Sequence, residues 1–121
     1  MTTNTSYNCE VDYDERFDFL SIRRPGFKTT YSLEAGAMTI DMTRKEFVGV
    51  EIQNATVLLS ELLGARISKA QLAGITKAKA GFVEKNNYLA IIVGLTFGNR
   101  TYEKEINIQK VPLSPILAVS R

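Results

Sequence analysis

Two carboxylates in the first half of the sequence, Asp41 and Glu51, are spaced so that they could act as an acid/base pair. Apolar residues alternate on both sides of the polar segment Thr43–Glu46, which predicts two antiparallel strands joined by a hairpin loop. Pairing that puts Ile40 beside Val50 leaves the two acids as near neighbours on the opposite side of the sheet. Adjacent carboxyl groups push their pKa values apart, so that one could donate a proton while the other accepts one.

Neighbouring strands on a solvated face also bring carboxylates together without any function. Arg44 and Lys45 stand between the two acids in the sequence, so we expect Asp41 and Glu51 to belong to a salt-linked surface. On this interpretation the chain has no catalytic residue. An enzyme that uses both acids, with a metal ion, is an alternative.

Three further carboxylates, Asp12, Asp14 and Asp18, surround the first predicted turn. Their oxygen atoms suit Mg²⁺ or Ca²⁺. A calcium loop of the D-x-D-x-D-G type needs an acid or Asn at position 16 and Gly at position 17, where this chain has Arg16 and Phe17. We therefore expect these acids to serve in turns and caps, and no metal ligand is predicted.

Five basic residues could gather at one end of the predicted sheet and contact phosphate groups. They are Arg23, Arg24, Lys28, Arg44 and Lys45. Phe27 and Tyr31 could add faces on which bases stack. The same residues fall in or beside turns, where charge is expected for solubility, and no RNA- or DNA-binding motif accompanies them. Nucleic-acid contact is therefore an alternative and not the main prediction.

The composition excludes several kinds of chemistry. The 121 residues carry a net charge of +2 and include no histidine, which removes Ser-His and Cys-His nucleophile activation and the usual zinc ligand sets. The one cysteine, Cys9, excludes an intrachain disulfide and alternates onto an apolar face, so we expect a buried, inert thiol in a reducing compartment. The scattered glycines form no phosphate-binding loop, and no cofactor is predicted.

The sequence shows no signal-peptide pattern and no apolar run of the ~20 residues that a membrane span needs. We therefore expect a cytoplasmic protein with no membrane partner.

Alternating apolar residues predict the strands that would carry these side chains. The apolar rows are Tyr7 to Tyr13, Leu20 to Ile22, Thr29 to Leu33, Met38 to Met42, Val48 to Ile52, Ala78 to Phe82, Leu89 to Phe97 and Tyr102 to Ile108. In the last group, turns at Asn86-Asn87 and Gly98-Asn99 allow one register to align every row. That register pairs Leu95 with Tyr102 and Phe82 with Ile91.

Between the two groups of strands the period changes from two residues to that of a helix. Asn54 is a favoured N-cap, and residues 55–63 repeat apolar side chains at helical spacing up to Gly64. Ser68 followed by Gln71 is a capping box for a second, shorter helix. The chain is thus predicted to be a single α+β domain over residues 1–121. It would contain an N-terminal antiparallel β-meander of about five strands, two short helices and a three-stranded antiparallel meander.

Several short pieces of the front half occur in a characteristic order. They are Tyr13-Asp14, Asp18-x-Leu20-x-Ile22, Ile40-Asp41 and Val48-Gly49-Val50-Glu51-Ile52 running into Asn54-Ala55. Over about residues 7–63 they resemble the family known as domain of unknown function 2283. The resemblance implies a β-meander followed by a helix and brings no established activity. The family's loop before the Gly-Val-Glu-Ile strand usually carries an Asp and a Gly, whereas here it reads Thr43-Arg44-Lys45-Glu46, which argues against a metal loop.

The main functional prediction is a non-enzymatic interaction or scaffold module that forms a homo-oligomer, most simply a dimer. Neither proline nor a visible bulge protects the sheet edge expected at Arg100–Lys110. Beyond Pro112 and Pro115, the apolar segment Ile116–Val119 has no obvious partner in its own strand. We expect this tail to dock onto its own domain or onto a second copy.

Overall fold

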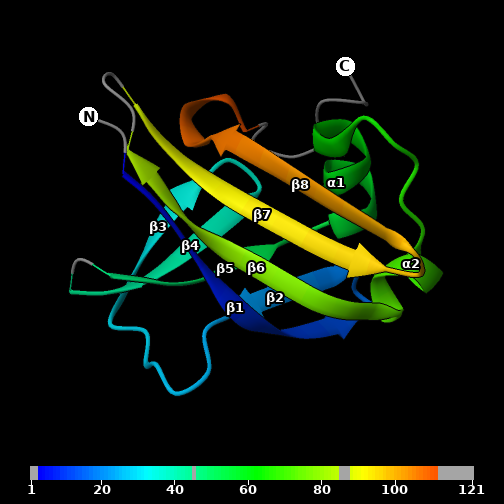
Figure 1. Cartoon of the computed structure of the whole chain (residues 1–121), viewed down its shortest axis with the longest axis horizontal. Helices are drawn as coiled ribbons and strands as arrows, with labels where there is room; N and C mark the ends of the chain where they lie inside the picture. The colour runs from blue at the N-terminus through cyan, green and yellow to red at the C-terminus, as the bar shows by residue number, and fades with distance from the viewer. Residues whose placement is uncertain (1–2, 45, 85–87, 112–121) are drawn as a thin grey trace.

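The computed structural model describes residues 3–44, 46–84 and 88–111, and they form antiparallel strands, two α-helices and a short 3₁₀ turn (Figure 1). The elements are β1 Thr3–Asp14, β2 Phe19–Arg23, β3 Tyr31–Ala35, β4 Met38–Thr43, β5 Glu46–Ile52, α1 Ala55–Leu63, α2 Lys69–Ala73, β6 Ile75–Glu84, β7 Leu89–Phe97, β8 Arg100–Asn107 and η1 Ile108–Lys110. The expected mixture of antiparallel strands with two short helices is confirmed.

All eight strands belong to one sheet, in the order β3-β4-β5-β2-β1-β6-β7-β8. The predicted division into a five-stranded meander and a separate three-stranded meander is wrong, because β1 is part of both. Its second half, Glu10–Asp14, pairs with β2, while its first half, Thr3–Cys9, pairs with β6. A strand of twelve residues is long enough to hold two partners, one after the other along its length.

The strand order in the first half also differs from a simple meander. β2 pairs with β5, and β3 is left at the edge beside β4. Burial explains this order: Leu20 and Ile22 of β2 are fully buried, as are Val50 and Ile52 of β5, whereas four of the five residues of β3 are exposed. The apolar strands therefore occupy the interior, and the segment 24–30 carries the chain to the outer position.

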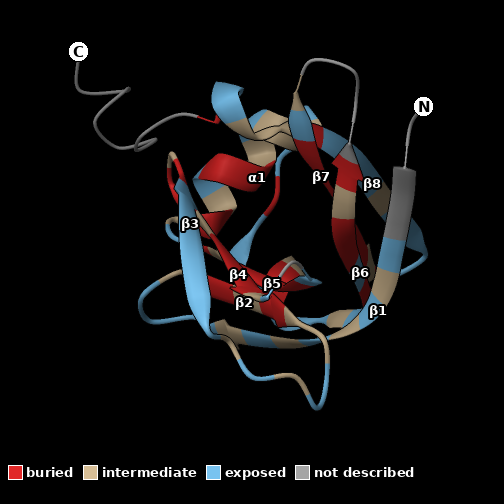
Figure 2. Cartoon of the chain, turned by 90° about the vertical axis from the view of Figure 1, so that its left-hand side faces the viewer, coloured by how far each residue is buried: buried red, intermediate tan, exposed pale blue. Residues whose placement is uncertain are grey.

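The sheet curls so that its two halves face one another (Figure 2). Buried side chains of β2, β4 and β5 meet those of β6 and β7 in one core. The rings of Phe47 and Phe82 join the halves edge to face, with 5.5 Å between their centroids. Helix α1 lies at the open side of the curl and packs against β8. The arrangement is a half-barrel closed by one helix.

The registers predicted for the second half are confirmed. Leu95 pairs with Tyr102, and Phe82 pairs with Ile91. Gly98 turns the chain between β7 and β8 with a φ of 60°, a conformation that glycine adopts without strain. The predicted turn at Asn86-Asn87 and the apolar tail Ile116–Val119 lie outside the described residues.

Both helices occur where the period changes, and Ser68 and Gln71 form the predicted capping box of α2. The predicted side-chain cap of α1 is wrong. Asn54 has a left-handed backbone (φ 50°, ψ 50°) and makes no cap hydrogen bond. The cap comes from the β1–β2 turn. Both carboxylate oxygens of Asp18 accept from the Thr56 N–H, at 3.1 and 3.2 Å.

Asp18 is held in place by several partners. Its Oδ2 accepts from the Thr56 hydroxyl at 2.6 Å, and its Oδ1 accepts from the Tyr13 hydroxyl at 2.7 Å. The backbone oxygen of Asp18 accepts from the N–H of Ala55. A residue 38 positions away from Thr56 therefore performs the task that local sequence assigned to Asn54.

Replacing Asp18 should be more damaging than replacing the residue at the helix junction. We expect Asp18→Ala to lower the free energy of unfolding by about 2 kcal/mol, since it removes the helix cap and leaves the Tyr13 hydroxyl without its partner. Asn54→Gly should be neutral or slightly stabilising because glycine relieves the left-handed conformation. Urea unfolding of the two variants measures both effects. Equal losses in the two variants would contradict the assignment of the cap.

Candidate functional site

The carboxyl pair, Asp41 and Glu51, forms as its spacing suggested. β4 and β5 pair Ile40 with Val50, which is the predicted register, and Asp41 lies opposite Gly49. Glu51 stands two residues further along β5 on the same side of the sheet. The two carboxyl groups are within hydrogen-bonding reach of each other.

Asp41 is not a surface residue, and the expectation that it would be is wrong. Only 3% of it is exposed, and it is the one charged residue among the described residues that is buried. The Ser32 hydroxyl on β3 donates to Asp41 Oδ1 at 2.8 Å, and Glu51 approaches from the opposite flank. Side chains of the two flanking strands therefore enclose the carboxylate and supply its hydrogen bonds.

Glu51 holds a proton that an ordinary glutamate would release. Its hydrogen bond with Asp41, then its partial burial, then the negative charge of Asp41 raise the pKa of Glu51 from 4.5 to about 7. The positive charge of Arg23 opposes this shift. Below neutral pH the protonated Glu51 can therefore donate a hydrogen bond to Asp41.

The basic residues singled out in the sequence do not gather into one free patch. The guanidinium of Arg23 donates to the backbone oxygen of Phe27 and to the Thr29 hydroxyl, both at 3.2 Å. Lys28 and Arg44 are exposed, and Lys45 lies outside the described residues. Arg23 therefore braces the segment that follows β2.

Arg24 is committed even more strongly to the interior. Its guanidinium carbon lies 3.6 Å from the ring centroid of Tyr7 and 3.8 Å from that of Phe27, so the group is stacked between two aromatic faces. Its Nη1 donates to the backbone oxygen of Phe47 at 2.9 Å and lies 3.8 Å from Glu46 Oε1. Arg24 thereby ties β1 and β5 to the segment after β2.

The β3 edge, defined as Tyr31–Ala35, is the exposed border of this half of the sheet (Figure 2). Tyr31 and Leu33 pair with Met42 and Ile40 and so share the apolar side of the sheet, yet they are 43% and 39% exposed. Ser32, on the other side, connects the edge to Asp41. The candidate site therefore consists of an uncovered apolar strand and the carboxyl pair directly behind it.

The remaining sequence candidates have structural partners. Asp14 accepts from the backbone N–H groups of Arg16 and Phe17, and Asp18 caps α1, in agreement with the expected turn and capping roles. Cys9 is half-buried, and burial raises the pKa of its thiol. Within residues 3–44, 46–84 and 88–111, no group of three or more Cys, Asp or Glu side chains is arranged to hold a metal ion.

Two parts of the site were missed at the sequence level. Ser32 was read only as part of a strand, and β3 was placed in the middle of a meander, where its edge would have been covered. Apolar content gives no signal for the border position, since β3 has three apolar residues in five (Tyr31, Leu33 and Ala35) and β4 has three in six (Met38, Ile40 and Met42).

Comparisons with protein-family models, with curated proteins and with solved structures gave no match. The resemblance to domain of unknown function 2283 therefore stays a prediction. No helix in the described part of the chain has the length and apolar character needed to cross a membrane.

The raised pKa of Glu51 predicts that the stability of the fold depends on pH. Because the pKa of Glu51 is raised in the folded chain, the folded state binds a proton that the unfolded state releases between pH 4.5 and about 7. That contribution to stability is complete below pH 4.5 and is lost as the pH rises to 7. Glu51→Gln keeps the neutral hydrogen bond, so it should match wild type at pH 5 and exceed it at pH 8. Since solvent screens a half-exposed group, we expect the variant to be more stable than wild type at pH 8 by about 1 kcal/mol.

Thermal unfolding at pH 5 and pH 8 measures this difference. A stabilisation of the same size at both pH values would contradict the raised pKa of Glu51.

Gly49 pairs with Arg23 on one side and with Asp41 on the other. We expect any side chain at this position to lower the stability of the fold. A Cβ at this position would lie 2.5 Å from the backbone oxygen of Ile22 and 2.7 Å from the Cβ of Arg23. We expect Gly49→Ala to cost about 2 kcal/mol or more, because strand backbone has to move. Gly94→Ala is the matched control, since its Cβ would meet nothing closer than 3.8 Å. Chemical denaturation should show a neutral or slightly stabilised control, and equal losses would refute the steric argument.

Proposed function

We propose that the chain is a non-enzymatic interaction module that self-associates through the β3 edge into a two-fold dimer. The observation that carries the proposal is an edge strand with exposed apolar side chains, one charged residue and a sequence that complements itself. An edge strand presents unpaired N–H and C=O groups that can continue a sheet with another strand.

The sequence of β3, Tyr-Ser-Leu-Glu-Ala, fits a second copy of itself. A two-fold axis through Leu33 would place Tyr31 opposite the partner's Ala35 and Ser32 opposite the partner's Glu34. Large then faces small, and each Glu34 carboxylate faces a serine rather than another carboxylate. An axis through Glu34 would instead oppose like charges, which is destabilising. The Leu33 register is therefore favoured, and it covers the exposed sides of Tyr31 and Leu33 in both copies.

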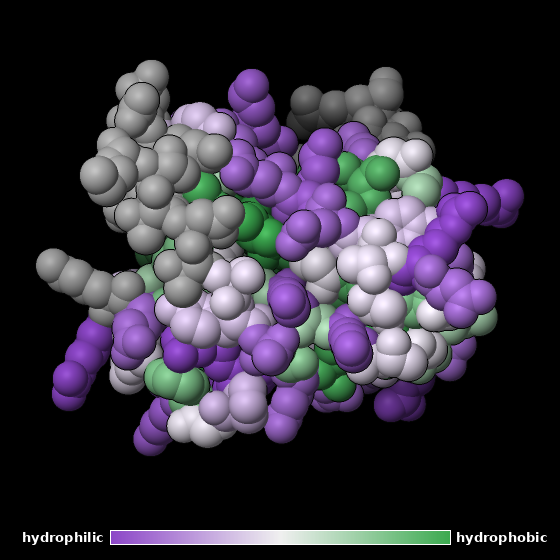
Figure 3. All heavy atoms as spheres, in the orientation of Figure 1, coloured by the Kyte–Doolittle hydropathy of each residue, from purple (hydrophilic) through white to green (hydrophobic). Residues whose placement is uncertain are grey.

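The other surfaces of the sheet are less suited to this contact. The opposite edge, β8, carries four charged residues in eight, namely Arg100, Glu103, Lys104 and Glu105. Charged side chains on an edge strand discourage pairing with another chain. In the view of Figure 3, purple hydrophilic and near-white side chains surround a smaller green apolar patch. Any contribution of the apolar tail falls outside the described residues.

The two alternatives have weaker support. The guanidinium groups of Arg23 and Arg24 donate to backbone oxygens of the chain itself. Among the described residues of this basic set, Lys28 and Arg44 remain exposed. An enzyme using Asp41 and Glu51 would need access to a carboxylate that is 3% exposed. Both observations favour an interaction module over a phosphate-binding or acid/base site.

Cysteine cross-linking tests the register as well as the association. In a Cys9→Ser background, Leu33→Cys places the two thiols on the axis, where directly opposed Cβ atoms lie about 4.5–5.5 Å apart, and mild oxidation should give a covalent dimer. Tyr31→Cys is the register control. Its two copies would be four residues apart along the strands, roughly 14 Å, and should not join.

Leu33→Lys should shift the chain toward monomer in light scattering because it buries a charge in the contact. Val57→Lys is matched to it, since Val57 is 42% exposed and belongs to α1 rather than to β3. The control should keep the wild-type mass. The proposal would be refuted if the wild-type chain is still a monomer at about 100 μM. The dissociation constant of a dimer would then be weaker than a standard interface gives.

A further inference from the structure

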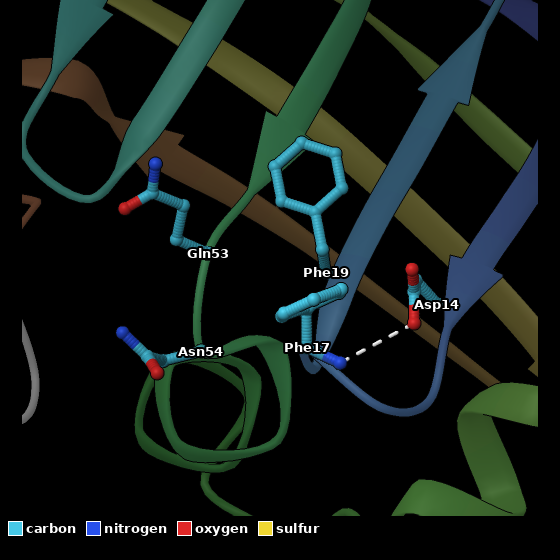
Figure 4. A pocket seen from close by; sticks show the side chains of 5 residues that line it. All are labelled: Asp14, Phe17, Phe19, Gln53 and Asn54. Carbon is cyan, nitrogen blue, oxygen red and sulfur yellow. Dashed lines mark hydrogen bonds between the residues drawn. The ribbon is translucent and has the colours of Figure 1, made fainter.

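A pocket of about 410 Å³ opens beside the β1–β2 turn (Figure 4). We call it the turn pocket. It is lined by Asp14, Phe17, Phe19, Gln53 and Asn54. Its volume falls in the range of small-ligand sites. Figure 4 shows the two phenylalanine rings in the middle, Asp14 on one side of them and the two carboxamides on the other.

The aromatic part of the pocket is unusually open. Phe17 is 67% exposed, the largest exposed fraction among the large apolar side chains in the described part of the chain. The Arg16 guanidinium carbon lies 5.0 Å from its ring centroid, although Arg16 does not line the pocket. This ring therefore already accepts a cation from its own chain.

Negative charge dominates around the pocket. Among the described residues that line it, Asp14 is the one that carries a charge, and Glu15 and Asp18 are close by in the same turn. Burial, then the hydrogen bond to Asp18, and then the negative charges of Asp18, Glu15 and Asp14 raise the pKa of the neighbouring Tyr13 hydroxyl. The N-terminus of α1 does not offset this charge, because Asp18 already occupies it.

The polar groups of the pocket have capacity for a ligand. Asp14 accepts its two backbone hydrogen bonds on Oδ1 alone. Asn54 makes no cap bond despite its left-handed backbone, and Gln53 uses only its backbone N–H, which donates to Ala37. A carboxylate and two carboxamides are therefore available on opposite sides of an apolar floor.

We propose that the turn pocket binds an arginine side chain of a peptide. The guanidinium would donate to Asp14, the methylene stem would lie across Phe17 and Phe19, and the carboxamides of Gln53 and Asn54 would bond the peptide groups. A nucleotide fits less well, because its phosphate would meet acidic residues and none of the described lining residues is basic. The inference does not rest on the proposed dimer, because none of the described residues that line the pocket belongs to β3.

NMR titration of the ¹⁵N-labelled chain tests the proposal with N-acetyl-L-arginine amide as the probe. The amide signals of Phe17 and Asn54 should shift and saturate. N-acetyl-L-citrulline amide has the same shape without the charge, and it should bind about tenfold more weakly or not at all. Butylguanidine keeps the cation and stem without peptide groups. Binding several-fold weaker than that of the arginine probe supports a peptide ligand, and equal binding would overturn that part of the proposal.

Variants locate the interaction. Asn at position 14 can still accept the two turn hydrogen bonds. The Asp14→Asn variant should bind the arginine probe about tenfold more weakly than wild type does. Asp12→Asn, on the same strand and outside the pocket, should bind as wild type does. Phe17→Ser alters an exposed ring, so it should leave the fold intact and reduce binding. No saturable shift up to about 50 mM would overturn the proposal. Equal binding of the citrulline probe, an unaffected Asp14→Asn or tighter binding of adenosine would also overturn it.

Discussion

The rest of the structure depends on one constraint, which is that β1 pairs with β2 along its second half and with β6 along its first half. Each half of the sheet has one apolar side that must be removed from water, and a single layer of strands cannot cover that side by itself. The shared strand turns these two sides toward each other. The Phe47 and Phe82 rings then meet across the core, and α1 closes the remaining opening. Arg24 stacks on Tyr7 of β1 and donates to the backbone of β5, so it connects the shared strand to the first half of the sheet.

The candidate site follows from the same arrangement. β2 takes the interior position beside β5, so β3 is displaced to the border and keeps Tyr31 and Leu33 exposed. Asp41 then lies one strand behind the border and Glu51 two strands behind it, and the Ser32 hydroxyl connects β3 to Asp41. The turn pocket arises at the start of β2, where the β1–β2 turn meets the beginning of α1. Local strand order, rather than any catalytic motif, thus creates both surfaces proposed for binding.

Sequence patterns predicted local features well and long-range ones poorly. The two-residue period of apolar side chains located most strands, and hairpin geometry fixed the registers of Ile40 with Val50 and Leu95 with Tyr102, because short connections leave few alternatives. The division of β1 between two partners could not be predicted, since alternation shows which side of a strand is apolar and not which strand lies beside it. The same limit hid the cap that Asp18 supplies to Thr56 and the burial of Asp41, both of which depend on residues that come together only in the fold.

Hydrogen exchange measured at several protein concentrations tests the central claim, association through β3, most directly. Amides on the free side of an edge strand exchange with solvent unless another strand pairs with them. If two copies join through β3, protection of the amides within Tyr31–Ala35 rises with concentration, while protection of Arg100–Asn107 in β8 stays constant. Protection of β3 that does not change with concentration, or a rise confined to β8, would contradict the account.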